Sequence, residues 1–289
     1  DSNGRAVTTT GPAEIANSAT ADILADIATD GTLHFSGTGA LRLAADLLVN
    51  GIGSDLTIDA SELILTASHT LETDGGDITL GTVTPETAGA CALTLDSGTG
   101  DITIDGPVGN AETPLNHLAV SATHVTFDGA SATLETNGLA VSATGTVTFD
   151  AAVTVHGTVS IDADTAVLNA PLTADTGARG PATVTLTVAN SATLAGNLTA
   201  DSAITFDGAG DVHLGADLEV RNGFQDITLP SGTLVLTDDA AITTACGDVS
   251  LAAVATDTDG AHTLTVTLGA GSFEVAGQVG NDGATLGGI

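Results

Sequence analysis

The sequence predicts an all-β protein, a right-handed parallel β-helix (a β-solenoid) of about 13 turns with roughly 19 to 24 residues each. Three observations favour this fold class. The chain contains a long internal repeat, and a shorter strand-like phrase recurs inside that repeat. Its composition is also poor in the large aromatic residues that fill most globular cores.

The long repeat appears when the sequence is shifted along itself so that position 31 lies on position 202, a shift that we call the repeat offset. Residues 31–118 then match residues 202–289 without a gap, and GDITIDGPVGN at 100–110 corresponds to GSFEVAGQVGN at 271–281. We therefore expect residues 1–289 to form a single continuous β-solenoid. Residues 1–171 are the first copy of the repeat and residues 172–289 a partial second copy. The second copy stops inside the unit, so the segment is expected to belong to a longer chain.

The short repeat consists of an apolar residue, Thr and a second apolar residue, as in LTID around Thr57 and ITID around Thr103. Such alternation is typical of strands, and a step of about 20 residues is typical of stacked supersecondary units. Like strands would lie about 4.8 Å apart in successive turns. Ile102, Ile104, Val125 and Phe127 are then expected to point inward. The residues expected to form an outward row are Thr103, Thr126, Thr148, Thr205 and Thr228.

The composition supports a narrow core. The chain has no Trp, Tyr or Met and only six Phe, although 42% of its residues are hydrophobic. A stack of short turns would be disrupted by bulky aromatics, which fits their absence. The alternative fold is a pair of tandem antiparallel β-sandwiches of about 85 residues each. The sequence shows no repeat at half of the repeat offset and no buried-Trp signature. Either feature would have supported that alternative.

The charge excludes several kinds of partner. The chain carries 36 Asp and Glu against four Arg (Arg5, Arg42, Arg179 and Arg221) and no Lys, which gives a net charge of −32 at pH 7. Nucleic acid and anionic membrane surfaces would repel it. The sequence contains no run of 18 or more apolar residues, so no membrane-spanning segment is predicted. The first residues, DSNGRAVTTTG, lack the basic region and the apolar region of a signal peptide. This is expected of a mature or excised segment, or of a chain that is not exported.

Several phrases resemble one known family. GDITLGTV at 76–83, DSGTGDITIDGPVG at 96–109 and LAVSATHVTFDGA at 118–130 are similar to the filamentous-haemagglutinin type of large bacterial secreted proteins. They are also similar to other giant surface proteins with β-strand repeats. The resemblance implies an exported, right-handed β-helical stalk that serves adhesion or a fibrous coat at the cell surface. Stalks of this family have no catalytic residues, and the sequence shows no clear copy of the family's N-terminal secretion domain.

Acidic corners are the strongest candidates for chemistry. Carboxylates cluster at 74–77, 96–101, 207–211 and 257–260, and Ca²⁺ prefers six to eight oxygen ligands. The match to an EF-hand loop is poor, and Asp and Gly are also the residues that turn geometry selects. We therefore assign no metal-binding residue and no cofactor. Ca²⁺ remains an open alternative.

Other candidate sites are weaker. His117 and His124 could meet on one turn, but no zinc-binding spacing occurs, and ordinary surface histidines are expected. An outward Thr row could bind ice, although most turns offer one Thr where such faces need two. Asn197 begins the only glycosylation sequon, and its meaning depends on the host. About seven turns separate Cys91 from Cys246, too far for a disulfide.

We predict no catalytic and no cofactor-binding residues, and hence no enzyme. A lyase acting on acidic sugars would need cations to bind its substrate, and the chain has only four Arg. The expected function is structural: a segment of an extracellular filament or adhesin stalk that acts by rigidity and self-association into filaments or longer repeat arrays. A cell surface or host receptor is a further possible partner. The alternative is a cation-dependent (Ca²⁺) cell-surface adhesion or coat module.

Overall fold

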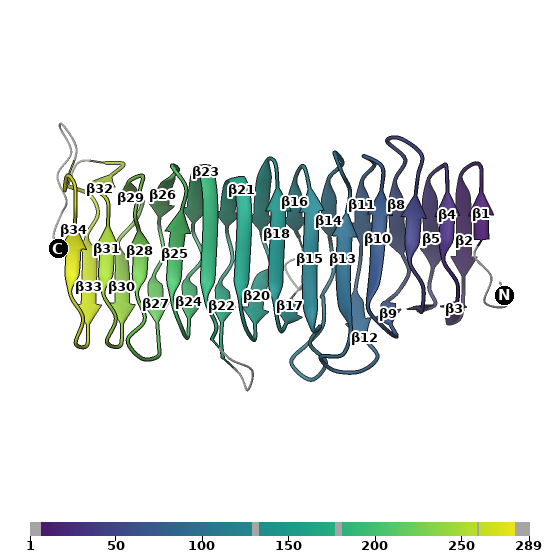
Figure 1. The fold of residues 1–289 in the computed structure, drawn as a ribbon, viewed down its shortest axis with the longest axis horizontal. Coiled ribbons are helices and arrows are strands. Elements are labelled where there is room, and N and C mark those ends of the chain that lie inside the picture. Colours follow the sequence, from purple (N-terminus) through teal and green to yellow (C-terminus); the bar gives the residue numbers. More distant parts are fainter. Residues whose placement is uncertain (1–6, 129–132, 177–180, 259, 281–289) are drawn as a thin grey trace. The chain divides into compact units, whose positions relative to one another are not determined.

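The computed structural model of the chain describes residues 7–128, 133–176, 181–258 and 260–280. The chain divides into two compact units, residues 1–145 and 146–289. All regular structure in the described residues is β-strand, and the strands of successive turns pair in parallel (Figure 1). The protein is therefore a right-handed parallel β-solenoid, as predicted, and not a pair of antiparallel sandwiches.

The strands of the first unit fall into three rows, and each turn contributes one segment to each row. The first row contains β1 (Val7–Thr9), β4 (Ile27–Thr29), β7 (Leu47–Val49), β10 (His69–Thr73), β13 (Ala92–Asp96), β15 (His117–Ala122) and β18 (Leu139–Ala143). The second row contains β2 (Ala13–Asn17), β5 (Leu33–Gly37), β8 (Leu56–Asp59), β11 (Ile78–Leu80), β14 (Ile102–Ile104) and β16 (Val125–Phe127). The third row contains β3 (Ala21–Ile23), β6 (Leu41–Leu43), β9 (Leu63–Leu65) and β12 (Val83–Pro85). It continues through the single bridging residue Val108 to β17 (Thr133–Thr136).

The second unit has the same three-row construction. One row contains the first half of β21 (Val159–Leu168), the first half of β23 (Val184–Leu194), β25 (Ile204–Asp207), β28 (Ile227–Leu229), β31 (Val249–Leu251) and β34 (Phe273–Val275). The next contains β19 (Thr146–Phe149), the second halves of β21 and β23, β26 (Asp211–Leu214), β29 (Leu234–Leu236) and β32 (Val254–Thr256). The last contains β20 (Ala152–Val155), β22 (Leu172–Ala174), β24 (Leu198–Ala200), β27 (Leu218–Val220), β30 (Ala240–Thr244) and β33 (Leu264–Leu268).

The number of turns is about 12, slightly below the predicted 13. The reason lies in the loops, which lengthen some turns more than the short repeat suggests. The step between paired residues is 20 from Val7 to Ile27 but 25 from Ala92 to His117. A loop bulging from a corner adds residues without adding a turn.

The core lies inside the turns and follows the predicted alternation. Ile102, Ile104, Val125 and Phe127 are at most 2% exposed. The Thr residues predicted to point outward are all partly exposed. Inward residues of paired strands therefore stack directly on one another, while parallel backbone hydrogen bonds join one turn to the next.

The strand positions recur between the two units at the repeat offset. The bounds of β7, β9, β10, β11, β12 and β14, shifted by this offset, are those of β27, β29, β30, β31, β32 and β34. The pairing register recurs as well, since Leu47 pairs with Leu71 and Leu218 with Ile242. The correspondence extends upstream of the sequence match: the same shift places β2 and β3 on the two halves of β23, and β4 on β24.

Candidate functional site

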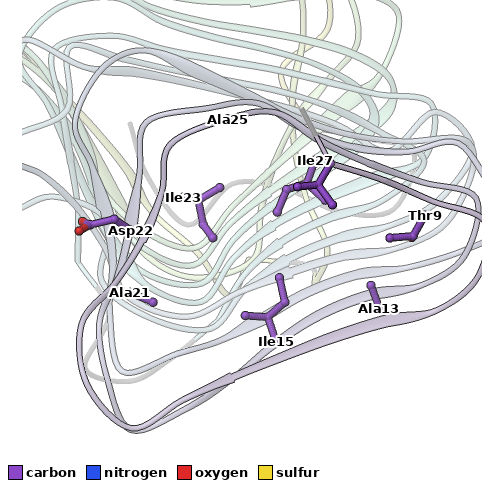
Figure 2. A pocket seen from close by; sticks show the side chains of 9 residues that line it. Thr9, Ala13, Ile15, Ala21, Asp22, Ile23, Ala25 and Ile27 are labelled. Carbon is purple, nitrogen blue, oxygen red and sulfur yellow. The ribbon is translucent and has the colours of Figure 1, made fainter. Parts of the chain in front are cut away.

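A cavity of about 510 Å³ opens at the first turn of the first unit. Figure 2 shows the side chains of Ile15, Ile23 and Ile27 pointing into this cavity, whereas the Asp22 carboxylate points away from it. The lining is mainly apolar because these are the inward positions of the strand alternation. The lining residues are Val7, Thr9, Ala13, Ile15, Ala21, Asp22, Ile23, Ala25 and Ile27.

The cavity exists because the first turn is covered on one side only within the described residues. β1, β2 and β3 pair with β4, β5 and β6 of the second turn, and no other described strand pairs with them. Val7 is 38% exposed, whereas Leu33 and Leu41 in the second turn are 0% and 1% exposed. Within the described residues, the inward side chains of the first turn therefore form an accessible apolar surface.

Carboxylates stand at the entry of many strands, where they bind the backbone of the next turn. Asp55, immediately before β8, accepts a hydrogen bond from the backbone N–H of Asp77 at 3.0 Å. Asp77, immediately before β11, accepts one from the N–H of Asp101 at 2.8 Å, and Asp101 accepts one from the N–H of His124 at 3.1 Å. We call these residues, with their counterparts in the second unit, the strand-entry acids. The counterparts are Asp226 and Asp248.

The strand-entry acids satisfy donors at corners where the backbone ladder is interrupted. Asp248 N–H donates to Asp226 at 2.8 Å, and the N–H and Oγ of Ser272 donate to Asp248 at 2.7 and 2.9 Å. Charge-assisted bonds of this kind are stronger than neutral ones. They lower the pKa of the Asp248 carboxyl below its ordinary value, with the backbone N–H of Ser272 as the largest cause and its hydroxyl as the second.

This lowered pKa predicts a loss of stability in acid. A carboxyl whose folded pKa lies below its unfolded value contributes stability that is complete above the unfolded pKa and is lost as the pH falls through the folded pKa. The melting temperature should therefore fall more steeply below about pH 4 for the wild type than for Asp248→Asn. The asparagine oxygen accepts the same N–H but does not titrate. Thermal melts from pH 7 to pH 2 provide the measurement.

Asp207→Asn is the matched control, because the Asp207 carboxylate accepts the N–H of the adjacent Gly208 and not that of the next turn. Its acid profile should follow the wild type. Identical profiles for wild type and Asp248→Asn would contradict a stabilising role for the Asp248–Ser272 bonds.

Several carboxylates of the predicted acidic corners accept backbone hydrogen bonds, either from the next turn or from their own turn. Asp77 and Asp101 bind the next turn, Asp211 accepts the N–H of Thr233 at 2.8 Å, and Asp96 accepts that of Gly98. At 257–260, Asp257 Oδ1 lies 2.9 Å from His262 Nε2, while residue 259 is outside the described residues. No group of three or more His, Cys, Asp and Glu in the described residues is arranged to hold a metal ion.

The backbone-binding role of the strand-entry acids was not predicted, although the sequence carries a signal for it. An Asp stands directly before the apolar-Thr-apolar phrase in SDLTI, GDITL, GDITI and QDITL. Turn geometry alone does not require Asp at that one position. A fixed position immediately before each strand indicates a bond from the side chain to the neighbouring turn.

Outward Thr rows occur in both units, but the five threonines that were predicted to form one row do not share one, since Thr148 pairs with Val167 and Thr205 pairs with Thr185. In the first unit Thr57 pairs with Thr79, Thr79 with Thr103 and Thr103 with Thr126. In the second unit a row contains Thr185, Thr205, Thr228 and Ser250. Cross-strand Thr pairs stabilise a sheet through contacts of their methyl groups and hydroxyls, so the row contributes to the stack itself.

His117 and His124 stand at the starts of neighbouring strands. A Cβ placed on Gly138 would lie 2.7 Å from His117 Nδ1, and one placed on Gly145 would lie 2.4 Å from His124 Cε1. Each imidazole therefore covers a glycine.

Both cysteines are free thiols. Cys91 is 2% exposed, and burial raises the pKa of its thiol above the ordinary value. A buried thiol with a raised pKa is unreactive at neutral pH. Cys246 is partly exposed and is the more accessible of the two.

Comparisons with known proteins add no relative. No protein-family model, curated protein or solved structure matches the chain. The fold nevertheless defines the class: the chain is a repeat protein with the architecture of a parallel β-solenoid. The described residues contain no helix that is long and apolar enough to cross a membrane.

Proposed function

We propose that the chain is a structural segment of an extracellular filament or adhesin stalk at the cell surface, and that it acts by rigidity and self-association without catalysis. The observation that carries the proposal is the recurrence of strand bounds and pairing register at the repeat offset. Repetition of the same turns lengthens a structure while it adds no new kind of site.

The side-chain chemistry supports this proposal. Inward residues are used in the core, the strand-entry acids bind backbone N–H groups, and the outward Thr residues stack on one another. The net charge of −32 favours solubility at high local density. The finer proposal, a stalk of the filamentous-haemagglutinin type, rests on the phrases that resemble that family.

Rigidity can be tested by distance measurements along the chain. Dyes can be attached at Thr57→Cys and Thr228→Cys in a Cys246→Ser background. Cys91 should stay unlabelled, because it is buried and the pKa of its thiol is raised. Both sites point outward and are partly exposed, so labelling should not disturb the core. For a stiff stalk, single-molecule energy transfer should give one narrow distance distribution that EDTA does not change. A broad or multiple distribution would contradict the proposal.

The alternative function is cation-dependent adhesion, and the acidity of the chain is the observation that favours it. Divalent cations could bridge carboxylates on two molecules. Such a bridge does not require a preformed site on one molecule. Beads coated with the chain should then clump in about 1 mM Ca²⁺ and disperse in EDTA. Beads that behave the same with and without Ca²⁺ would remove this alternative and leave the structural function.

A further inference from the structure

Three Asn-Gly pairs lie in the described residues, and each is a candidate for chemical modification. They are Asn50–Gly51, Asn137–Gly138 and Asn222–Gly223. Asparagine is a thermolabile residue, because the backbone nitrogen of the residue that follows can attack its side-chain amide. A following glycine leaves this nitrogen unhindered, since glycine has no Cβ. The environment of each pair therefore decides which of the three reacts in the folded protein.

The reaction requires only the chain and water. The glycine nitrogen forms a bond to the asparagine Cγ, the Cγ–Nδ2 bond breaks, and ammonia leaves with the proton of the glycine N–H. Water then adds to one of the two carbonyl carbons of the resulting five-membered succinimide and opens the ring, which gives aspartate or isoaspartate. No electrons are transferred. A pair reacts fast where its backbone can rotate and no hydrogen bond holds the glycine nitrogen.

The pair Asn222–Gly223 meets both requirements. It lies in the loop 221–226 between β27 and β28, and every residue of this loop is exposed. Gly223 has a φ of +70°, and a Cβ placed on it would meet nothing within 4 Å. Among the described residues, the Gly223 N–H has no acceptor and the Asn222 side chain has no hydrogen-bond partner. Only the Asn222 N–H, which donates to Asp201 O at 3.2 Å, ties the pair to the neighbouring turn.

The pair Asn137–Gly138 is held by the fold. Gly138 is buried, and its N–H donates to Thr136 Oγ1 at 3.3 Å. Its carbonyl oxygen accepts hydrogen bonds from the Thr136 hydroxyl and from the Leu118 N–H, both at 2.9 Å. The Asn137 N–H donates to Leu115 O at 2.8 Å. Attack by the Gly138 nitrogen would require these bonds to open first.

The pair Asn50–Gly51 provides an internal comparison, because the repeat offset places its loop, between β7 and β8, on the loop between β27 and β28. The Asn50 N–H donates to Thr29 O at 2.7 Å. A Cβ placed on Gly51 would lie 2.0 Å from Asp30 O, so the Gly51 backbone lies against the previous turn and cannot rotate freely. In the second copy Asn222 stands at the position of Gly51. The pair is thereby moved one residue along the loop, to a place where nothing opposes rotation.

We propose that Asn222 is a self-modification site of the folded protein, at which the Gly223 nitrogen and water convert the asparagine to isoaspartate and aspartate, while Asn50 and Asn137 are protected. This inference does not depend on the proposed structural function. The product carries one more negative charge on an exposed loop. Isoaspartate also lengthens the main chain, and the open space around Gly223 accommodates the added length. The modified chain therefore stays folded.

Incubation of the folded chain at mildly alkaline pH tests the proposal, because the attacking nitrogen must lose its proton. Mass spectrometry of proteolytic peptides measures the loss of ammonia and the formation of isoaspartate at each asparagine. Asn222 should react about tenfold or more faster than Asn50 or Asn137, since each hydrogen bond that must open slows the attack. The same chain unfolded in urea is the matched control. There the three pairs should react at similar rates, because each is followed by glycine.

Two variants check the assignment without peptide analysis. On anion exchange, incubated wild-type chain should acquire a more acidic form that elutes with Asn222→Asp, and Asn222→Ser should acquire none at the same rate. Thermal melts of fresh and incubated wild type should coincide. Equal rates at the three asparagines in the folded chain would overturn the proposal, as would an Asn222 that reacts only in urea.

Discussion

Replacing Gly76 or Gly247 by alanine is expected to lower the free energy of unfolding by about 3 kcal/mol. A Cβ on Gly76 would lie 1.9 Å from the carbonyl oxygen of Ser54, and one on Gly247 would lie 1.6 Å from that of Gln225. Real Cβ atoms do not approach oxygen so closely, and the obstacle is backbone of the previous turn. The corner must therefore move, which breaks the registered stacking on both sides of it.

Gly11→Ala is the control, because a Cβ there would meet nothing within 4 Å. This variant should change stability by less than about 0.5 kcal/mol. Urea denaturation monitored by circular dichroism measures the three variants against the wild type. Since the repeat offset places Gly76 on Gly247 at equivalent corners, their effects should be similar. Tolerance of alanine at both would show that the turns are not stacked as closely as the structure has them.

The inward and outward positions could be predicted from sequence because a strand has a side-chain period of two. Once ITI at 102–104 and VTF at 125–127 are read as strands in neighbouring turns, the orientation of each residue follows. The parallel arrangement follows as well, since a step of about 20 residues between like strands leaves room for the crossover connection that parallel pairing requires. These features depend on local alternation and on the repeat step, and the sequence displays both directly.

The lengths of individual turns could not be predicted in the same way. Loops such as the one between β12 and β13 extend a corner without changing the rows it connects. The third row of the first unit narrows to the single bridging residue Val108, which pairs with Val83 and Leu134. No alternating phrase marks a one-residue bridge, because its pairing is decided by the turns on either side.

The candidate site illustrates the difference between residue type and residue environment. The sequence identifies the acidic corners, and its pattern there is compatible with both turn chemistry and calcium binding. Which N–H each carboxylate accepts depends on a residue 22 to 24 positions away, as with Asp55 and Asp77 or Asp77 and Asp101. Likewise, the apolar character of Ile15 and Ile23 is visible in the sequence. The cavity around these residues depends on which strands pair with the first turn, and local alternation does not show that pairing.

Placing a carboxylate inside the stack should have the largest effect of any single substitution considered. Ile227 is 0% exposed and lies between Ile204 and Val249 of the neighbouring turns. In Ile227→Asp the ladder loses its apolar contacts, and a group that needs water or a hydrogen-bond partner is buried without one. The expected loss exceeds about 4 kcal/mol, a large share of the roughly 5–15 kcal/mol that stabilises a typical domain.

Thr228→Asp adds the same side chain one residue later and provides the matched control. Thr228 is partly exposed and lies in the outward row between Thr205 and Ser250. The new carboxylate stays hydrated and the two residues paired with it are uncharged, so the change should be within about 1 kcal/mol. Equilibrium denaturation of both variants measures the difference. Because adjacent residues of a strand face opposite sides, equal costs at positions 227 and 228 are incompatible with β28 being a strand of the stack.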